Sequence, residues 1–432
     1  MRKLTALLFM AVMVTAGTSL AQTQFKVGTG MLADNNIFRN YASQGDVIYM
    51  PYAMLGYNAQ LTSSDNLYLA YDGDFYLFSE LSHRDFSIHG VGVDFNHLWP
   101  ESRTLLSTGA RYEGRFNPDD YSYYNYSSGG LYLNFKRYIA GSLLMYASYN
   151  LNGRSFSEFQ EFNYLEHVGS LRFNYSLPSR TTFSISGTYY YKDYTQAVAV
   201  LDSSYITPPA DQGEPPPIMG PGMGGGYGNG YGRGGMSQQM QDFLQQQFPG
   251  DTTGFYIYHF GSEQFPSTSQ FVLGLSVAQN IAEGTGLMIG YYGQANPTKR
   301  NRFLSSIGES VLNNEELFDD HYSYIGHEGK IQLRQMLPGE STLTLLFSAR
   351  RRSFSGRPAL DMEGIPLASG ESRLDNAVLF TAMFAKSFSV GSFSMLDNFQ
   401  LSLQGGVGRN SSNDAYYDYD SAWFSLGIEK KF

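Results

Sequence analysis

Hydrophobic and polar residues alternate one by one along most of this chain. In the clearest segment, 65–78, Leu67 and Leu69 fall on one face and Asp72 and Asp74 on the other. Successive side chains of a β-strand point to opposite faces, so such alternation indicates a strand with one apolar face. Over most of the chain no helical stripe of period 3.6 competes with it. The pattern therefore predicts an all-β protein.

We count sixteen such segments, although fourteen or eighteen also fit, because the segments 23–33 and 389–398 are ambiguous. The expected strands are 23–33, 46–62, 65–78, 84–98, 103–117, 123–139, 142–157, 165–177, 181–195, 267–281, 286–296, 322–336, 341–355, 373–388, 396–409 and 418–432.

The connections between these strands alternate between short turns and longer polar stretches. Pro338-Gly339-Glu340 and Glu283-Gly284-Thr285 are tight turns with suitable residues. The longest connections are about 196–266, 297–321 and 356–372. This alternation predicts an up-and-down sheet with short turns at one end and long loops at the other.

The two ends of the chain carry export and assembly signals. Residues 1–21 combine a charged start, an apolar stretch and the cleavage site Ser19-Leu20-Ala21, which is the pattern of a signal peptide. The last strand alternates up to a terminal aromatic residue, Phe432. Together these features resemble bacterial outer-membrane β-barrel proteins, whose insertion machinery reads the final strand and its aromatic residue. Lys430 departs from that family's usual apolar residue.

This resemblance implies a single transmembrane antiparallel β-barrel over residues 22–432 in the outer membrane. It also implies periplasmic termini, long extracellular loops, an even strand number and contact with lipid and lipopolysaccharide. It is a resemblance of architecture, so no family's functional residues can be placed on this sequence. It leaves the oligomeric state open.

Composition agrees with an exported barrel and excludes several classes of function. The chain has 34 Tyr and 31 Phe, which barrels use in girdles at the membrane surfaces. It has no Cys, so disulfide bonds and thiolate metal sites are excluded. Acidic residues outnumber basic ones by 39 to 29, which argues against nucleic-acid binding. No cofactor is expected.

Two local motifs have unremarkable explanations. The low-complexity stretch 208–235 matches a nucleotide-binding glycine pattern only by its glycine content, and we expect it to be a disordered loop. Residues 237–248 after it could form a short helix, either on the surface or as a gate in the barrel mouth.

Asp319-Asp320-His321 could belong to a hydrolase site at the barrel rim. Without a placed partner we expect a solvated loop end there, and therefore no enzyme. Loop acids could bind calcium weakly, but ordinary polar loop chemistry explains them equally well. They are Asp119, Asp120, Asp414, Asp418 and Asp420.

Charged residues on the polar faces of the strands carry more information, because charges at membrane depth must face a lumen or one another. The predicted lumen-lining residues are Asp72, Asp74, Asp94, Arg111, Glu113, Arg115, Arg172, Glu328, Lys330, Arg334, Arg350 and Arg352. Their mixed signs fit either an aqueous pore or a filled lumen with paired charges. If the lumen is open, we expect only a weak preference for anions.

A barrel of about 16 strands is too wide for its wall side chains to fill, as in porins. The sequence therefore favours a porin-like channel for passive or weakly selective passage of small solutes. The alternative is a non-conducting barrel that serves as a surface scaffold, an adhesion platform or a partner in secretion.

Overall fold

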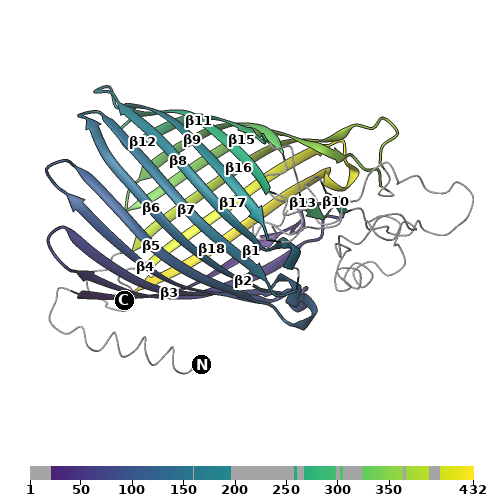
Figure 1. The fold of residues 1–432 in the computed structure, drawn as a ribbon, viewed down its shortest axis with the longest axis horizontal. Helices are drawn as coiled ribbons and strands as arrows, with labels where there is room; N and C mark the ends of the chain where they lie inside the picture. The colour runs from purple at the N-terminus through teal and green to yellow at the C-terminus, as the bar shows by residue number, and fades with distance from the viewer. Residues whose placement is uncertain are drawn as a thin grey trace, which may run out of the picture.

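A closed antiparallel barrel of sixteen strands makes up most of the described part of the chain (Figure 1). The computed structural model describes residues 21–158, 160–195, 257–259, 267–297, 302–304, 324–362, 366–388 and 399–432. The barrel strands are β1 (Ala21–Asp34), β2 (Asp46–Gln60), β3 (Asp65–Phe78), β4 (Phe86–Trp99), β5 (Thr104–Phe116), β6 (Tyr126–Ala140), β7 (Leu143–Phe156), β8 (Tyr164–Ser176), β9 (Thr181–Tyr194), β11 (Ser267–Ala282), β12 (Thr285–Ala295), β14 (Ile325–Leu337), β15 (Ser341–Pro358), β16 (Ser372–Phe388), β17 (Phe399–Ser412) and β18 (Tyr419–Lys431).

Each of these barrel strands pairs with the barrel strands before and after it in the chain, and β1 pairs with β18 to close the ring. The prediction of sixteen strands is confirmed, with differences only at strand ends. For example, β6 begins at Tyr126 rather than at 123, because η2 (Asp119–Tyr124) occupies the preceding loop. The loop 208–235 and the expected helix 237–248 lie outside the described residues.

The two ends of the barrel differ. At one end, which we name the turn end, tight turns join the strands, and Gly284 and Gly339 adopt the positive φ angles that such turns need. The C-terminus also lies there (Figure 1).

The opposite end, the loop end, carries the longer connections. These contain the short helices η1 (Ser82–Arg84), η2, η3 (Gln160–Phe162) and η6 (Ala415–Tyr417). A separate two-stranded sheet pairs β10 (Ile257–His259) with β13 (Arg302–Leu304). No helix in the described ranges is long and apolar enough to cross a membrane.

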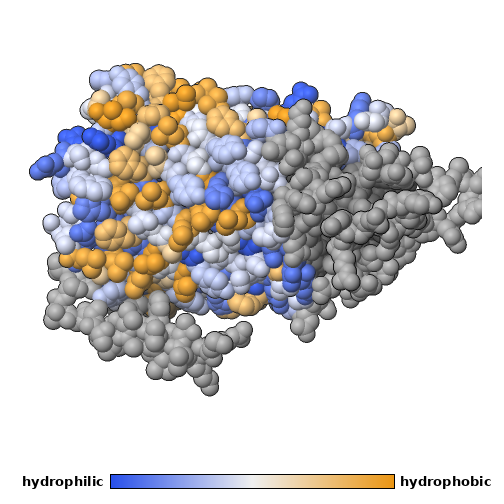
Figure 2. Space-filling view, in the orientation of Figure 1, coloured by the Kyte–Doolittle hydropathy of each residue, from blue (hydrophilic) through white to orange (hydrophobic). Residues whose placement is uncertain are grey.

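The outer wall of the barrel is apolar and exposed. Figure 2 shows apolar residues spread across one face of this wall. Outward residues on successive strands include Phe75, Leu77, Val91, Val93, Leu131, Leu133, Leu171, Ile185, Leu273, Leu275, Ile289, Ile331, Phe347, Phe380, Phe424 and Ile428. A closed barrel with such a wall satisfies every backbone group of the sheet and suits a hydrocarbon environment.

The first loop of the chain, residues 35–45, folds into the barrel at the loop end. Its Ile37 packs against inward residues of the first four strands, among them Ile48, Phe78 and Phe86. Trp423 of β18 lies against the same cluster. The buried amide of Asn36 donates to the backbone oxygens of Asn40 at 2.7 Å and Asp420 at 3.2 Å. This apolar cluster narrows the loop end along one side.

The final strand ends in an aromatic contact at the turn end. The backbone N–H of Phe432 donates to the carbonyl of Phe25 at 2.8 Å, and the two rings lie 5.6 Å apart. The ammonium of Lys430 lies 4.9 Å from the ring of Phe432 and 5.2 Å from the ring of Phe399. Lys430 therefore keeps a charged group beside aromatic faces at the barrel edge, which accounts for its departure from an apolar residue.

Deletion of Phe432 should reduce assembly of the barrel, because both the aromatic contact with Phe25 and the terminal assembly signal are lost. The measurement is the amount of heat-modifiable band in outer-membrane fractions on unboiled gels. Phe432→Tyr keeps the ring and serves as the matched control. Equal folded protein in the deletion and the control would contradict this role of Phe432.

Candidate functional site: the barrel interior

All twelve charged residues predicted to line the lumen lie on inward positions of their strands. The residues before and after each of them on the strand face outward; Arg350, for example, stands between the exposed Ala349 and Arg351, three residues beyond the outward Phe347. The structure brings most of them together in two groups on opposite walls. That they line a conducting path stays a prediction.

The first group is an acidic wall on β3, β4 and β5. Arg111 bonds to Asp72 at 2.8 Å and lies 3.6 Å from Glu113. The hydroxyl of Tyr126 donates to Glu113 at 2.7 Å, and that of Tyr132 donates to Asp94. With Asp74 this wall holds four carboxylates and one guanidinium.

The second group is a basic wall on β14 and β15. Lys330 pairs with Glu328 at 3.1 Å, and Arg350 lies directly across from Glu328 in the sheet. Arg334 is exposed nearer the turn end. In the closed order of strands β4 and β14 are eight positions apart, which is half the ring. The acidic and basic walls therefore face each other across the interior, while Arg172 on β8 lies between them with its guanidinium over the ring of Tyr146.

Two of the predicted residues, Arg115 and Arg352, lie inward but do not face open space. Arg115 is 4% exposed and its guanidinium lies 3.9 Å from the centre of the Phe86 ring. Arg352 is 1% exposed and bonds to Asp375 at 3.3 Å. The sequence prediction differs from the structure here, because packed side chains at the loop end cover both guanidinium groups.

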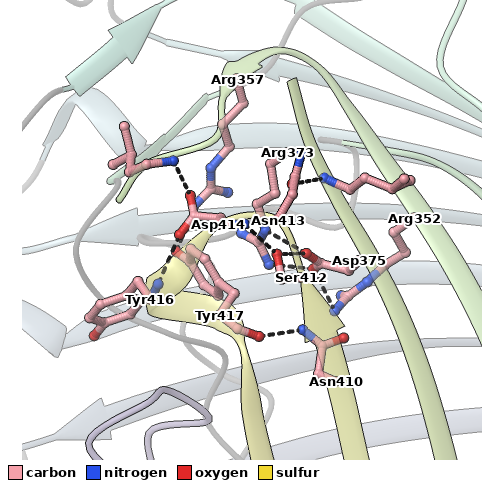
Figure 3. Close-up of polar contacts among 12 residues, drawn as sticks. Arg352, Arg357, Arg373, Asp375, Asn410, Ser412, Asn413, Asp414, Tyr416 and Tyr417 are labelled. Carbon is pink, nitrogen blue, oxygen red and sulfur yellow. Dashed lines mark hydrogen bonds and ion pairs between the residues drawn. The ribbon is translucent and has the colours of Figure 1, made fainter. Parts of the chain in front are cut away.

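Arg352 belongs to a buried polar cluster that ties two loops to the barrel wall (Figure 3). Arg373 donates to both oxygens of Asp375, at 3.0 and 2.6 Å, and its guanidinium lies over the ring of Tyr417. Arg357 donates to the Tyr417 hydroxyl at 2.5 Å.

Asp414, in the loop before η6, accepts backbone N–H groups of Leu360 at 3.3 Å and Tyr416 at 3.1 Å. Burial raises the pKa of Asp414 above its ordinary value, although the guanidinium groups of Arg373 and Arg357 pull it down. The side chain thus joins the loop after β15 to the loop after β17.

Asp375→Asn should destabilise the loop end, because Arg352 and Arg373 would keep their buried charges without the carboxylate between them. Breaking a buried ion pair costs about 3–5 kcal/mol. The measurement is the free energy of unfolding in urea for protein folded in detergent micelles. Asp420→Asn, which removes an exposed partner of Arg409, should cost at most about 1 kcal/mol. Equal effects of the two variants would contradict the structural role of Asp375.

Glycines on neighbouring strands let long inward side chains lie flat against the wall. Tyr52 on β2 crosses Gly28 on β1 and donates to Glu429 on β18 at 2.8 Å. The pair of Arg111 and Asp72 lies over Gly90 in the same way. These side chains are held back from the centre of the barrel, so the polar wall takes up little of the lumen.

Gly28→Ala should destabilise the barrel, because the added Cβ meets the ring of Tyr52. Overpacking of this kind costs about 1–3 kcal/mol. Gly286→Ala is the control, since no atom of the described chain lies within 4 Å of a Cβ at that inward position. The control should be neutral or gain up to about 1 kcal/mol. Urea unfolding measures both, and a neutral Gly28→Ala would show that Tyr52 moves aside freely.

Sequence reasoning missed the inward tyrosines and the arginines outside the predicted set. Tyr52, Tyr126 and Tyr132 fall on polar faces, but their partners depend on strand register. An inward glycine across from an inward tyrosine is a signal that could have pointed to them.

Asp319-Asp320-His321 lies outside the described residues. In the described ranges no three acidic or histidine residues form a group that could hold a metal ion.

No protein-family model matches this chain, and no curated protein matches its sequence. Solved structures of similar architecture include OpdL of Pseudomonas aeruginosa, with 9% identity, coverage of 96% of this chain and 99% of that chain, and a TM-score of 0.48. OccK8 (OprE) of Pseudomonas aeruginosa has 9% identity, coverage of 96% and 98%, and a TM-score of 0.47. OccAB1 of Acinetobacter baumannii has 8% identity, coverage of 95% and 96%, and a TM-score of 0.46. We transfer no residue role from them.

Proposed function

We propose that this protein is an outer-membrane channel for passive or weakly selective passage of small polar solutes. The proposal is based on the exposure of the inward charged side chains in a closed sixteen-stranded barrel. Their side chains remain partly exposed, for example 53% for Arg111, 23% for Asp72, 32% for Lys330 and 24% for Glu328. Charged side chains that stay this exposed inside a barrel require water there.

The same features support the compartment and the orientation that we propose. A closed barrel with an exposed apolar wall suits a bilayer, and an export signal would carry the chain across the inner membrane, beyond which the outer membrane is the bilayer it can enter. The turn end then faces the periplasm and the loop end faces the outside, as short turns and long loops do in bacterial barrels. The assembly machinery would read the strand that ends at Phe432, and outer-membrane lipid and lipopolysaccharide would surround the wall.

Selectivity is expected to be weak because the charges of the two walls oppose each other. The acidic wall pairs most of its carboxylates with Arg111 or with tyrosine hydroxyls. The basic wall holds Lys330, Arg334 and Arg350 against one carboxylate, Glu328. A fixed positive wall raises the local concentration of anions, while the acidic wall opposite limits the effect. We therefore expect weak selectivity, with at most a slight preference for anions.

Planar-bilayer recording of the refolded full-length protein tests this function. Wild type should give discrete conductance steps, and its reversal potential in a salt gradient should show a weak anion preference. Lys330→Gln/Arg350→Gln should shift the reversal potential toward cations, because two positive charges leave the wall. Arg351→Gln/Arg409→Gln removes two charges from the outer wall and should leave the potential unchanged.

One observation favours a second function. The loop 35–45 and the cluster around Arg373 narrow the loop end, so a closed barrel that serves as a surface scaffold is the alternative. Silence in the bilayer from protein that shows the folded heat-modifiable band would support the scaffold and reject the channel. A wild type that is strongly cation-selective would keep the channel and reject the role of the basic wall.

A further inference from the structure

Among the described residues, the outer wall repeats one pairing of side chains in three places. A tyrosine hydroxyl contacts the Nδ1 atom of a histidine on the next strand in the pairs Tyr71–His89 at 2.9 Å, Tyr149–His167 at 2.7 Å and Tyr291–His327 at 2.6 Å. In each pair the histidine lies two residues from the residue directly across from the tyrosine. Because Nδ1 is engaged, any further partner of the ring binds at Nε2.

Only one of the three pairs has a cation beside it. His327 on β14 lies directly across from Arg351 on β15, whereas His89 faces Gly73 and Gly114. His167 faces Leu151 and Tyr191. Tyr291, His327 and Arg351 therefore form a set on three adjacent strands that the rest of the described wall does not repeat.

Arg351 is an exposed cation on the outer wall, which is largely apolar. It follows the outward residues Phe347 and Ala349 toward the loop end. Among the described residues it makes no hydrogen bond or ion pair, and the exposed Asn376 lies directly across from it on β16. Arg409 on β17, the comparable outward arginine, bonds to Asp418 at 2.5 Å and Asp420 at 3.1 Å. The positive charge of Arg351 can therefore attract an outside anion, whereas that of Arg409 is already paired with two carboxylates.

We propose that Tyr291, His327 and Arg351, with Asn376 beside them, bind a phosphate of the phosphorylated glycolipid in the outer leaflet. A guanidinium on a lipid-facing wall is unfavourable unless it reaches the headgroup layer and an anion there. Guanidinium groups bind phosphate by paired charge-assisted hydrogen bonds, and the imidazole Nε2 and the Asn376 amide add neighbouring polar groups. The apolar residues toward the turn end, Phe347 and Ala349, would contact the acyl chains.

This inference rests on the proposed orientation, in which the loop end meets the outer leaflet. The test uses the full-length protein folded in detergent and titrated with bisphosphorylated lipid A, with the bound fraction read by native mass spectrometry. Arg351→Gln should weaken the apparent affinity about tenfold, as expected for the loss of one charge-assisted hydrogen bond. His327→Gln should weaken it less, and Arg351→Lys should restore part of it.

Matched controls come from the same chain. Arg409→Gln removes an outward arginine that already has partners, and His167→Gln changes a Tyr–His pair without an arginine; neither should alter binding. Equal losses in Arg351→Gln and Arg409→Gln would indicate general attraction to a charged wall and overturn the site. Unchanged binding in Arg351→Gln would overturn it as well. If Arg351→Gln does not fold, as shown by loss of the heat-modifiable band, lipid A binding by His327→Gln and Arg351→Lys is compared with wild type instead.

Two further measurements distinguish the phosphate of the glycolipid from that of a phospholipid and from free phosphate. Phosphatidylglycerol should bind without sensitivity to Arg351, and millimolar inorganic phosphate should not displace lipid A. Equal sensitivity with phosphatidylglycerol, or displacement by free phosphate, would overturn recognition of the glycolipid. An epitope inserted after Gly226 and tested on intact cells separates this failure from failure of the proposed function. If antibody reaches the epitope only after permeabilisation, both the proposed orientation and this inference are wrong. If antibody reaches it on intact cells and Arg351→Gln binds lipid A normally, only the proposed site is wrong.

Discussion

The pairing of β1 with β18 is the constraint on which the rest of the structure depends. It leaves the barrel sheet without an open edge, so every barrel strand has two partners and the backbone can be satisfied without water. Closure also converts the alternation along each strand into an inside and an outside. Apolar residues such as Phe347 then face outward and charges such as Arg350 face inward. A shift of register by one residue would exchange these two faces on a whole strand.

Inside the barrel, glycines and cross-strand bonds decide how much of the lumen the wall occupies. Tyr52 reaches Glu429 only because Gly28 between them has no side chain. Near the loop end the opposite occurs, since Arg373 and Tyr417 are stacked and fully covered. The middle of the barrel therefore keeps polar groups accessible, while its loop end is packed in the manner of a protein core. The middle of the wall thus sets the width of the lumen, while the packed loop end contributes to the stability of the barrel.

Much of this could be predicted from the sequence, because alternation fixes both the strand and the face of each residue. It placed Asp72 and Glu328 inward and located the strands to within a few residues. It could not show that Arg352 is buried, since that depends on Asp375, which the pairing of β15 with β16 brings beside it. Likewise, Tyr52 and Glu429 are 377 residues apart, and only closure of the ring brings them together. The local sequence pattern shows which face of a strand a residue lies on, whereas its burial depends on which residues the pairing of strands brings beside it.

The chain has only two tryptophans, and closure of the barrel places them in different surroundings. Trp99 is exposed on the outer wall at the turn end, and Trp423 lies on the inner face at the loop end. The tryptophan fluorescence of the protein is therefore the sum of a lipid-side emitter and a lumen-side emitter. Quenchers confined to acyl chains act on the first and water-soluble quenchers on the second. Folding of the wall and access to the interior can thus be followed separately in one unlabelled molecule.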